Sequence, residues 1–511
     1  MKKQHLLIIY SALCGLAPVA SPLSAQPAAS TSSSARVAEH LSVWQRLDET
    51  AWTNPALHGD AFQTSLTQLE AAASYHHQNR AFVPELGRQS LLPHVKASTF
   101  LHLSPRTKVW GEASYMNGRT KDVRWNSTAD FMLLVPYVIA DTVGGETHRE
   151  RYTFSGGYAT RLGLLALGGE MLFRAEQEYR TRDPHMRSVV SDLTLRAGAA
   201  HPWHKYTAAI GAEANVYRQT NDVEFYSETG GVTEYQMTGL GTSYLRFSGT
   251  EADIYYQGGG AGLNLDLRRQ QGSGAMAHVT LDEHRYRRVS SAHNSLPLTT
   301  LYRYHAGIEA GWRHRGHTEW AAWIQADYTK KSGDEHVAGA MSGGAYPVIA
   351  DLTQYKAYYR DLSLHALYGR TAATTWHVGV VTGVDNQHQR YLYPLRRLDV
   401  SHLYASLSAQ IIMSPTDRLT LEAALTATYR PHLDGTIAMP LADMQPFELR
   451  KQNEDYEMAK ADFTTADAHI RADYALPHGS YALFAELGGG MTHCSPGRHD
   501  MRLRLALGVT F

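Results

Sequence analysis

The chain ends on Met501-Arg-Leu-Arg-Leu-Ala-Leu-Gly-Val-Thr-Phe511. Successive side chains of a β-strand point to opposite faces, so this stretch has one apolar face and one face of arginines and small residues. Arginines would be costly in the dry core of a soluble sheet, but they are expected where one strand face meets lipid and the other a watery lumen. The stretch therefore predicts a membrane-spanning closing strand. Its apolar face holds the residues that we expect to direct assembly: Leu505, Leu507, Val509 and Phe511.

Neighbouring positions of this closing strand should respond differently to a charge. An arginine at Leu505 would face lipid and should prevent assembly. An arginine at Ala506 would face the lumen, and we expect a far milder effect there if the lumen is wet.

The same alternation recurs along the chain, for example over residues 94–103, 361–368 and 418–429. Short polar turns join these stretches at one end, and longer polar or glycine-rich segments, 119–149, 219–250, 331–353 and 431–456, join them at the other. This sorting of loop lengths is typical of outer-membrane barrels. Eight short turns, a first strand near 65–75 and the closing strand predict an all-β fold. That fold is a transmembrane antiparallel β-barrel of about 18 strands, with about 16 or 14 as alternatives.

The first 60 residues differ from the rest of the chain. Lys2 and Lys3 precede an apolar run at 6–16 and a small-residue site at Ser24-Ala25, which predicts a secretory signal peptide over residues 1–25. Residues 26–60 begin with a low-complexity stretch and are expected to form a periplasmic or lumenal plug, with the barrel over residues 61–511. The protein should then lie in the cell outer membrane with both termini in the periplasm. Cys494 would be the only thiol of the mature chain, so no internal disulfide is expected.

The composition agrees with a barrel and excludes other classes. The formal net charge of the 511 residues is -1, so no basic field predicts a nucleic-acid partner. No apolar stretch of about 20 residues follows the signal segment, which excludes helical spans. The mean hydropathy of -0.35 is compatible with a barrel, because only one face of each strand meets lipid. Thirty Tyr and nine Trp suit the aromatic girdles at the two membrane interfaces.

Asn54-Pro55-Ala56 precedes the first predicted strand. Proline fixes φ and removes a backbone donor, and asparagine can cap the resulting turn, so the tripeptide suits a junction between an interior segment and a strand. It resembles the Asn-Pro-Ala signature of the FadL-like fatty-acid channels, a resemblance that implies a hatch folded inside the barrel. The alternative is an ordinary turn before the first strand. The whole chain is also similar to an uncharacterised Bacteroidota outer-membrane barrel family, whose members tend to be encoded near TonB-dependent receptors.

Two sets of residues are candidates for ligand binding. The first set alternates cations with aromatic residues on neighbouring strands and could form a basic lumen strip for an anionic solute or a lipopolysaccharide phosphate: Arg285, Arg287, Arg303 and His305. Its alternative is charge pairing with lumen carboxylates such as Asp282 and Glu309. The second set lies near the long-loop rim and could capture a metal or haem: His76, His77, His493 and His499. Its alternative is scattered histidine among the 27 of the chain, and no cofactor is predicted.

Two long loops share a motif. Pro136-Tyr-Val-Ile-Ala-Asp141 and Tyr346-Pro-Val-Ile-Ala-Asp351 have Val-Ile-Ala-Asp in common. An apolar turn that caps itself with an aspartate would pack a loop onto the barrel rim. The alternative is a repeated ligand contact.

The sequence predicts transport or binding and no enzyme, since it has no Gly-x-Ser-x-Gly motif and no definable catalytic triad. The leading hypothesis is a channel, transporter or binding protein for a small hydrophobic or anionic solute. The alternative is a non-conducting platform that partners a surface lipoprotein or a TonB-dependent receptor in haem, metal or nutrient acquisition. Either function implies contact with the outer membrane, with lipopolysaccharide and with the barrel assembly machinery.

Overall fold

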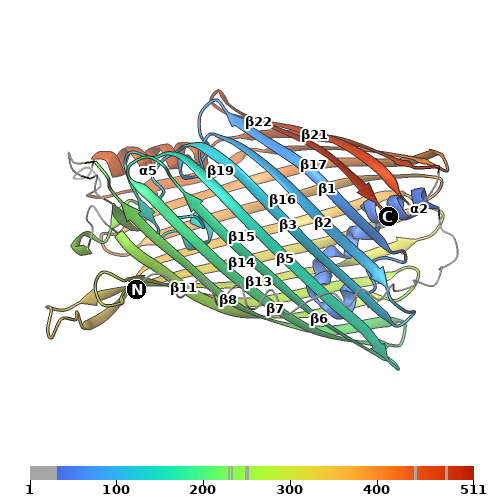
Figure 1. Cartoon of the computed structure of the whole chain (residues 1–511), viewed down its shortest axis with the longest axis horizontal. Helices are drawn as coiled ribbons and strands as arrows, with labels where there is room; N and C mark the ends of the chain where they lie inside the picture. The colour runs from blue at the N-terminus through green and yellow to red at the C-terminus, as the bar shows by residue number, and fades with distance from the viewer. Residues whose placement is uncertain (1–31, 228–230, 232–233, 248–251, 442–445, 478–480) are drawn as a thin grey trace. The chain divides into compact units, whose positions relative to one another are not determined.

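The computed structural model describes residues 32–511, apart from 228–230, 232–233, 248–251, 442–445 and 478–480. The predicted signal peptide and residues 26–31 of the predicted plug lie outside the described residues. Residues 32–511 form one compact unit in which long antiparallel strands run obliquely between two ends (Figure 1). No helix among the described residues is both long and apolar enough to cross a membrane.

The barrel is a closed ring of 18 strands, as the sequence predicts. Its strand segments are β1 (Leu66–Gln78), β2 (Gln89–His102), β3 (Thr107–Val123), β5 (Gly145–Leu162), β6 (Leu165–Tyr179), β7 (His185–Trp203), β8 (Tyr206–Glu224), β11 (Ala252–Arg269), β12 (Gly274–Ser290), β13 (Leu296–Arg315), β14 (Glu319–Ala338), β15 (Val348–Arg370), β16 (Thr374–Tyr391), β17 (Arg396–Thr416), β18 (Leu419–Arg430), β19 (His432–Ala438), β20 (Phe463–Ala475), β21 (Ala482–Cys494) and β22 (Arg498–Thr510). Segments β18 and β19 count as one strand, because both pair with β17 and only Pro431 separates them.

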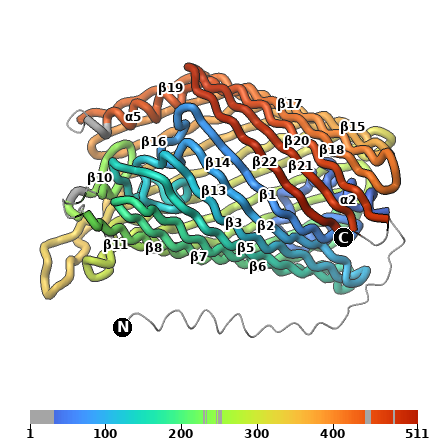
Figure 2. The backbone as a smooth tube through the Cα atoms, turned by 45° about the horizontal axis from the view of Figure 1, so that its top comes forward, coloured from blue at the N-terminus to red at the C-terminus, as the bar shows by residue number. Residues whose placement is uncertain are grey.

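The ring closes where β22 pairs with β1 along its whole length (Figure 2). Leu505 lies opposite Ala73 on the outer face and is 54% exposed. On the inner face, Arg504 forms ion pairs with Glu70 of β1 and with Glu486 of β21. The strand therefore shows apolar side chains outward and paired charges inward, which is the arrangement that lipid outside and water inside would select.

Burial at Ala506 argues against the far milder effect expected for an arginine there. Ala506 points inward, as predicted, but it is only 1% exposed. It lies opposite Glu486 in the register of β21 and β22, next to the ion pairs of Arg504. A side chain as long as arginine has no free volume at this position.

The two rims differ in loop length, with the longest connections, 124–144, 225–251 and 439–462, at one end only. We call this end the long-loop end and the other the short-turn end. The predicted long loop at 331–353 is mostly strand, because β14 runs to Ala338 and β15 begins at Val348. Residues of a strand that extends beyond the apolar band have water on both sides, so the alternation that marks a spanning strand is lost there.

Several short elements lie at the two ends of the barrel. At the short-turn end these are α2 (Ser33–Leu41), η1 (Gln45–Thr53) and α3 (Pro55–His58). At the long-loop end they are η2 (Pro84–Leu86), α4 (Phe131–Leu134), β4 (Ile139–Ala140), β9 (Tyr235–Gly239), β10 (Thr242–Ser243), η3 (Leu245–Phe247) and α5 (Pro446–Ala459), with β10, β9 and β4 forming a small separate sheet.

The largest apolar cluster lies inside the long-loop half of the barrel. Leu134, Tyr137 and Ile139 of the loop 124–144 pack on inward side chains of β7, β8 and β11–β14, such as Val190 and Leu301. This loop therefore enters the lumen instead of covering the rim. Burial of these large side chains is the main term that holds it there.

Candidate functional site

The short-turn end of the lumen is occupied by residues 33–58, which we call the plug (Figure 1). Trp44 is buried and its ring stacks on His377 of β16 at a centroid distance of 5.7 Å. Asp48 accepts a hydrogen bond from Arg313 of β13 at 2.7 Å. On another part of the wall, Gln410 of β17 accepts from Val43 N at 2.8 Å and donates to Leu41 O at 2.9 Å. The plug is thus attached to several parts of the ring by side-chain contacts.

Asn54 caps α3, and Pro55 and Ala56 are the first residues of this helix. All three are buried where the plug contacts the wall. The Asn54 side chain caps the helix by accepting from Ala56 N at 3.0 Å, as the sequence predicts for this turn. The tripeptide ends ten residues before Leu66, where β1 begins, so it joins two parts of the plug and does not adjoin the first strand.

The wall beneath α3 carries a row of small residues, which we call the glycine row: Ala159, Gly168, Gly198 and Gly211. They lie opposite one another on β5, β6, β7 and β8. A Cβ on Gly198 would lie 1.9 Å from Asn54 Oδ1, and one on Gly168 would lie 2.5 Å from Ala56 N. The wall therefore lacks side chains where the plug turn makes contact. Sequence reasoning missed this row, because the four residues align only once the strand register is known.

Gly198→Ala should loosen the plug and leave the barrel closed. The added methyl group overlaps a buried capping side chain, and overpacking of this kind costs about 1–3 kcal/mol, or about tenfold in the population of the detached plug. Proteolysis within residues 33–58 would measure the effect. Gly156→Ala on β5 is the matched control, because a Cβ there meets nothing within 4 Å. Equal cleavage of both variants would show that the row does not seat the plug.

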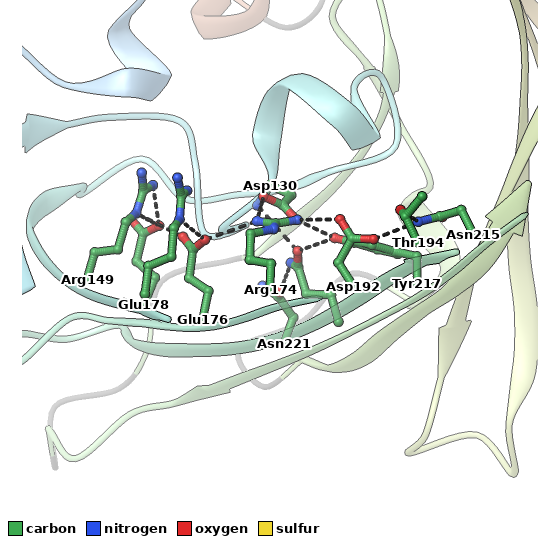
Figure 3. Close-up of polar contacts among 12 residues, drawn as sticks. Asp130, Arg149, Arg174, Glu176, Glu178, Asp192, Thr194, Asn215, Tyr217 and Asn221 are labelled. Carbon is green, nitrogen blue, oxygen red and sulfur yellow. Dashed lines mark hydrogen bonds and ion pairs between the residues drawn. The ribbon is translucent and has the colours of Figure 1, made fainter. Parts of the chain in front are cut away.

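The loop 124–144 is fixed to the wall by an ion-pair network (Figure 3). Arg174 of β6 contacts both carboxylate oxygens of Asp130, at 2.8 and 2.7 Å, and Tyr217 of β8 donates to the same carboxylate at 2.8 Å. Arg174 also lies 3.1 Å from Asp192 and 3.0 Å from Glu176. Burial alone would raise the pKa of Asp130, but the contacts with Arg174 outweigh it and lower the pKa. The carboxylate is therefore charged, and the loop is held by a charge-assisted bidentate contact.

The far side of the same loop rests on a fully buried ion pair. Arg180 and Asp141 have no exposed side-chain surface, and their charged groups lie 2.9 Å apart. Ser127 also donates to Asp141 at 2.9 Å, and Glu234 is a buried neighbour. The first Val-Ile-Ala-Asp motif thus anchors its loop, as the sequence hypothesis proposes. Asp351 of the second motif is exposed and pairs with His336 at 2.6 Å on the outer part of the β14–β15 hairpin.

Raising the pH from 7 to 9 should loosen β9 and β10. Burial first, and the Asp141 carboxylate second, raise the pKa of Glu234 from 4.5 to about 8. A carboxyl with a raised pKa stabilises the fold fully below its unfolded value, and this stabilisation is lost as the pH rises through the folded value. At pH 7, one unit below the folded value, about 1.4 kcal/mol of this stabilisation remains, and it is lost by pH 9, which corresponds to about tenfold more cleavage near β9 by a protease of constant activity. Glu234→Gln should remove the pH dependence, while Glu224→Gln at an exposed position should retain it; a pH response in Glu234→Gln would refute this account.

Two cavities are formed by described residues that line the lumen. The inner cavity, about 1020 Å³, lies against the plug, and its walls mix charged residues such as Glu70, Glu422 and Arg471 with apolar residues such as Trp323 and Val380. The outer cavity, about 500 Å³, lies between the inserted loop, α5 and the inward faces of β15–β17. Its walls are mainly apolar: Phe82, Phe131, Val138, Met237, Leu240, Leu398, Val400, Met458 and Phe463.

The cations near the outer cavity are already paired with carboxylates. Lys451 of α5 lies 2.5 Å from Glu85 and 2.7 Å from Asp455. Arg430 of β18 lies 2.8 Å from Asp385. Nearby carboxylates raise the pKa of Lys451 despite its burial, so the lysine stays charged and paired. The outer cavity therefore presents apolar surface and hydrogen-bonding groups without an unpaired cation among its described lining residues.

The four residues predicted to form a basic lumen strip are divided between the two faces of the wall. Arg303 and His305 point inward, where each lies 2.8 Å from Asp282. Arg285 and Arg287 share the outward face with Leu281, which is half exposed. The prediction of a single four-residue strip in the lumen is therefore wrong. The inward pair follows the alternative interpretation, charge pairing with Asp282.

The four rim histidines lie near one another at the barrel seam but do not form a coordination set. His76 points inward and pairs with the buried Asp500. His493 and His499 face each other across β21 and β22, with their Nδ1 atoms 3.2 Å apart, on the outward face that His77 also occupies. Among the residues that the structure describes, no group of three or more His, Cys, Asp or Glu side chains could hold a metal ion.

Comparison with known proteins identifies a family and several large barrels. A family described as "Family of unknown function (DUF6850)" matches residues 55–511. No curated protein matches the sequence. Among solved structures, a mutant ferric enterobactin receptor PfeA from Pseudomonas aeruginosa is 9% identical with a TM-score of 0.37, covering 87% of this chain and 80% of that chain. The ferric preacinetobactin receptor BauA from Acinetobacter baumannii is 7% identical with a TM-score of 0.39 and the same coverage.

A bacterial polysaccharide outer membrane secretin is 11% identical with a TM-score of 0.34, covering 73% of this chain and 94% of that chain. At this level of similarity the solved structures give no information about a ligand or partner of this chain.

Proposed function

The chain belongs to the DUF6850 family, and we propose that it is an outer-membrane barrel that binds a small amphipathic solute in its lumen and passes it inward when the plug moves. In this proposal the long-loop end faces the outside, and the plug and the C-terminus face the periplasm. The apolar outward face and the charged inward face of the strands support a place in a bilayer. The resemblance to FadL-like channels, in which the N-terminal segment folds inside the barrel, agrees with the position of the plug.

The observation that carries the proposal is the outer cavity, whose walls are mainly apolar and whose nearby cations are already paired. Its volume of about 500 Å³ falls within the usual range for small-molecule pockets. A channel for ions or sugars has no need of such walls, whereas a solute with an apolar body gains free energy there by leaving water. Gln387, Gln389 and Tyr359 also line the cavity and could hydrogen-bond a polar group on the solute. Because the nearby cations are paired, we expect the polar group to be uncharged.

The neutral probe N-phenyl-1-naphthylamine tests this proposal. The purified barrel should bind it with increased fluorescence, and Ala459→Trp should weaken binding by at least about tenfold, since an indole would occupy much of a pocket of this size. Leu433→Trp is the control, because Leu433 is exposed on β19 and does not line the cavity. Absence of binding, or equal binding by both variants, would contradict the proposal. A stoichiometric protein partner in the absence of probe binding would favour the interaction platform.

A further inference from the structure

The outward face of the barrel carries a cluster of basic side chains at the long-loop end, which includes the two arginines expected in the lumen. We call it the outer cationic patch: Arg285 and Arg287 of β12, Lys330 of β14, Lys356 and Arg360 of β15, and Arg390 of β16. The strand register brings them together. Lys330 lies opposite Tyr358, two residues from both Lys356 and Arg360, and Lys356 lies opposite Arg390.

The patch begins where the apolar band of the outer surface ends. On β12 the exposed Leu281 lies four residues before Arg285. On β15 the exposed Leu362 lies two residues after Arg360. Tyrosines lie among the cations, as at an interface between hydrocarbon and headgroups. The Arg285 guanidinium lies 5.5 Å from the ring centre of Tyr302, and the Lys330 ammonium lies 5.8 Å from that of Tyr304. The cations therefore stand at the height of lipid headgroups.

Three carboxylates share the outward face near the patch, but each contacts another group: Glu283 contacts Tyr304, Asp334 accepts a hydrogen bond from Thr353, and Asp399 pairs with His388 and Arg397. Within the described part of the chain, none of the patch's six cations forms an ion pair with a carboxylate of the protein. Arg397 of the adjacent β17 is left out of the patch, because Asp399 pairs with it. Six unpaired cations on neighbouring positions repel one another, and an anion bound among them would remove that cost.

The opposite side of the barrel shows that this is a local feature and not a general ring of charge. On β20, β21, β22, β1 and β2, no outward position of the strands carries a lysine or an arginine. Near the same rim those strands present residues such as Met491, Met501 and Gln89. Outward cations near this rim are therefore confined to part of the wall: β12–β16 carry the six of the patch, and β3, β7 and β8 carry Arg119, Lys121, Arg187 and Arg218.

We propose that the outer cationic patch binds the phosphate groups of a phosphorylated glycolipid of the outer leaflet, as found in lipopolysaccharide. The proposal rests on the placement of the long-loop end outside. Guanidinium groups bind phosphate oxygens in a bidentate manner, and two phosphates on one sugar headgroup match a patch that spreads over four strands. The bound lipid would lie against β12–β16, the wall that carries the inserted loop and the outer cavity on its inner side.

Lipid retention by the purified barrel, counted by native mass spectrometry, tests this proposal. The variant Arg285→Ala/Lys330→Ala/Arg360→Ala should bind diphosphorylated lipid A at least about tenfold more weakly than the unchanged protein. Arg119→Ala/Lys121→Ala removes two exposed cations of β3 and is the matched control, which should bind like the unchanged protein. Lipid A without phosphates should bind weakly to all three. Heat-modifiable gel migration should be the same for all three, since the substituted side chains face outward.

Three outcomes would overturn the proposal. Equal retention by the triple variant would show that the patch does not hold the lipid. Full displacement by millimolar inorganic phosphate would show a site for free anions, and equal retention of phosphatidylglycerol would show a general preference for anionic lipid. Binding of N-phenyl-1-naphthylamine, measured on the same samples, separates these outcomes from a failure of the proposed solute function, because the patch does not line the outer cavity.

Discussion

We expect Leu505→Arg to prevent closure of the barrel, so that the variant lacks heat-modifiable migration on a gel. Leu505 lies at the centre of β22, on the face that meets lipid, opposite Ala73 of β1 and Leu487 of β21. A charge near the middle of the bilayer costs about 2–4 kcal/mol on this face. This free-energy cost destabilises the pairing of the last strand with the first. If the two strands do not pair, each keeps an unpaired edge. Unsatisfied backbone groups in lipid then add several kcal/mol each.

The control is an arginine on the inner face of a neighbouring part of the wall. Ala424→Arg on β18 places the charge in the inner cavity, which Ala424 lines, so closure should be retained.

Deletion of Phe511 should act like Leu505→Arg but more weakly. It removes the two hydrogen bonds that Phe511 and Thr67 exchange, at 2.9 and 2.8 Å. Normal migration of both Leu505→Arg and the Phe511 deletion would mean that β22 does not span lipid.

Removal of residues 32–60 should convert a silent barrel into a conducting one. In planar bilayers the full chain is expected to give little current, because the plug is attached to the wall by Trp44, Asp48 and Gln410. Barrels of this strand number enclose an aqueous channel unless something fills it, so the shortened chain should conduct about tenfold more or better. The inserted loop remains in place and should keep the conductance below that of an unobstructed ring.

A control for this deletion is Arg46→Ala/Glu49→Ala. These two residues form an exposed ion pair within the plug, with their charged groups 2.7 Å apart, so their loss should leave the barrel silent. Conductance in the control would indicate that the plug is only loosely seated. No conductance in the shortened chain would place the block in the inserted loop, and Asp130→Asn, which weakens the contact with Arg174, would then be the next variant to measure.

The alternation of apolar and polar side chains along each strand predicts much of the barrel. The wrong predictions concern residues near the strand ends, where this alternation stops. The strand count, the closing strand and the turn formed by Asn54 depend on side chains that are near in sequence, so the sequence predicts them. The error at Arg285 and Arg287 was avoidable. Both have the same parity as Leu281 on β12, and an apolar residue on a barrel strand marks the outward face.

Other features could not be inferred, because they depend on contacts between distant residues. The loop 124–144 contains the apolar run 131–140, which signals burial but not its partners, because Leu134 and Tyr137 pack against strands up to about 200 residues away in the chain. The buried Arg180 and Asp141 are separated by 39 residues and look like two ordinary loop charges in the sequence. The glycine row and the outer cationic patch likewise appear only after the register of several strands is known.

The ion pairs of Arg504 with Glu70 and Glu486 bear on how the chain finds its correct ring. Before the last strand arrives, Glu70 belongs to an open edge, and Arg504 has at most one of its two partners. A shift of one residue between β22 and β1 would turn Arg504 toward lipid and separate it from Glu70. A misaligned ring of this kind has a higher free energy, because it places a charged side chain in hydrocarbon and loses an ion pair in the lumen. The electrostatic match between the first and last strands of the ring therefore favours the observed register over a neighbouring one.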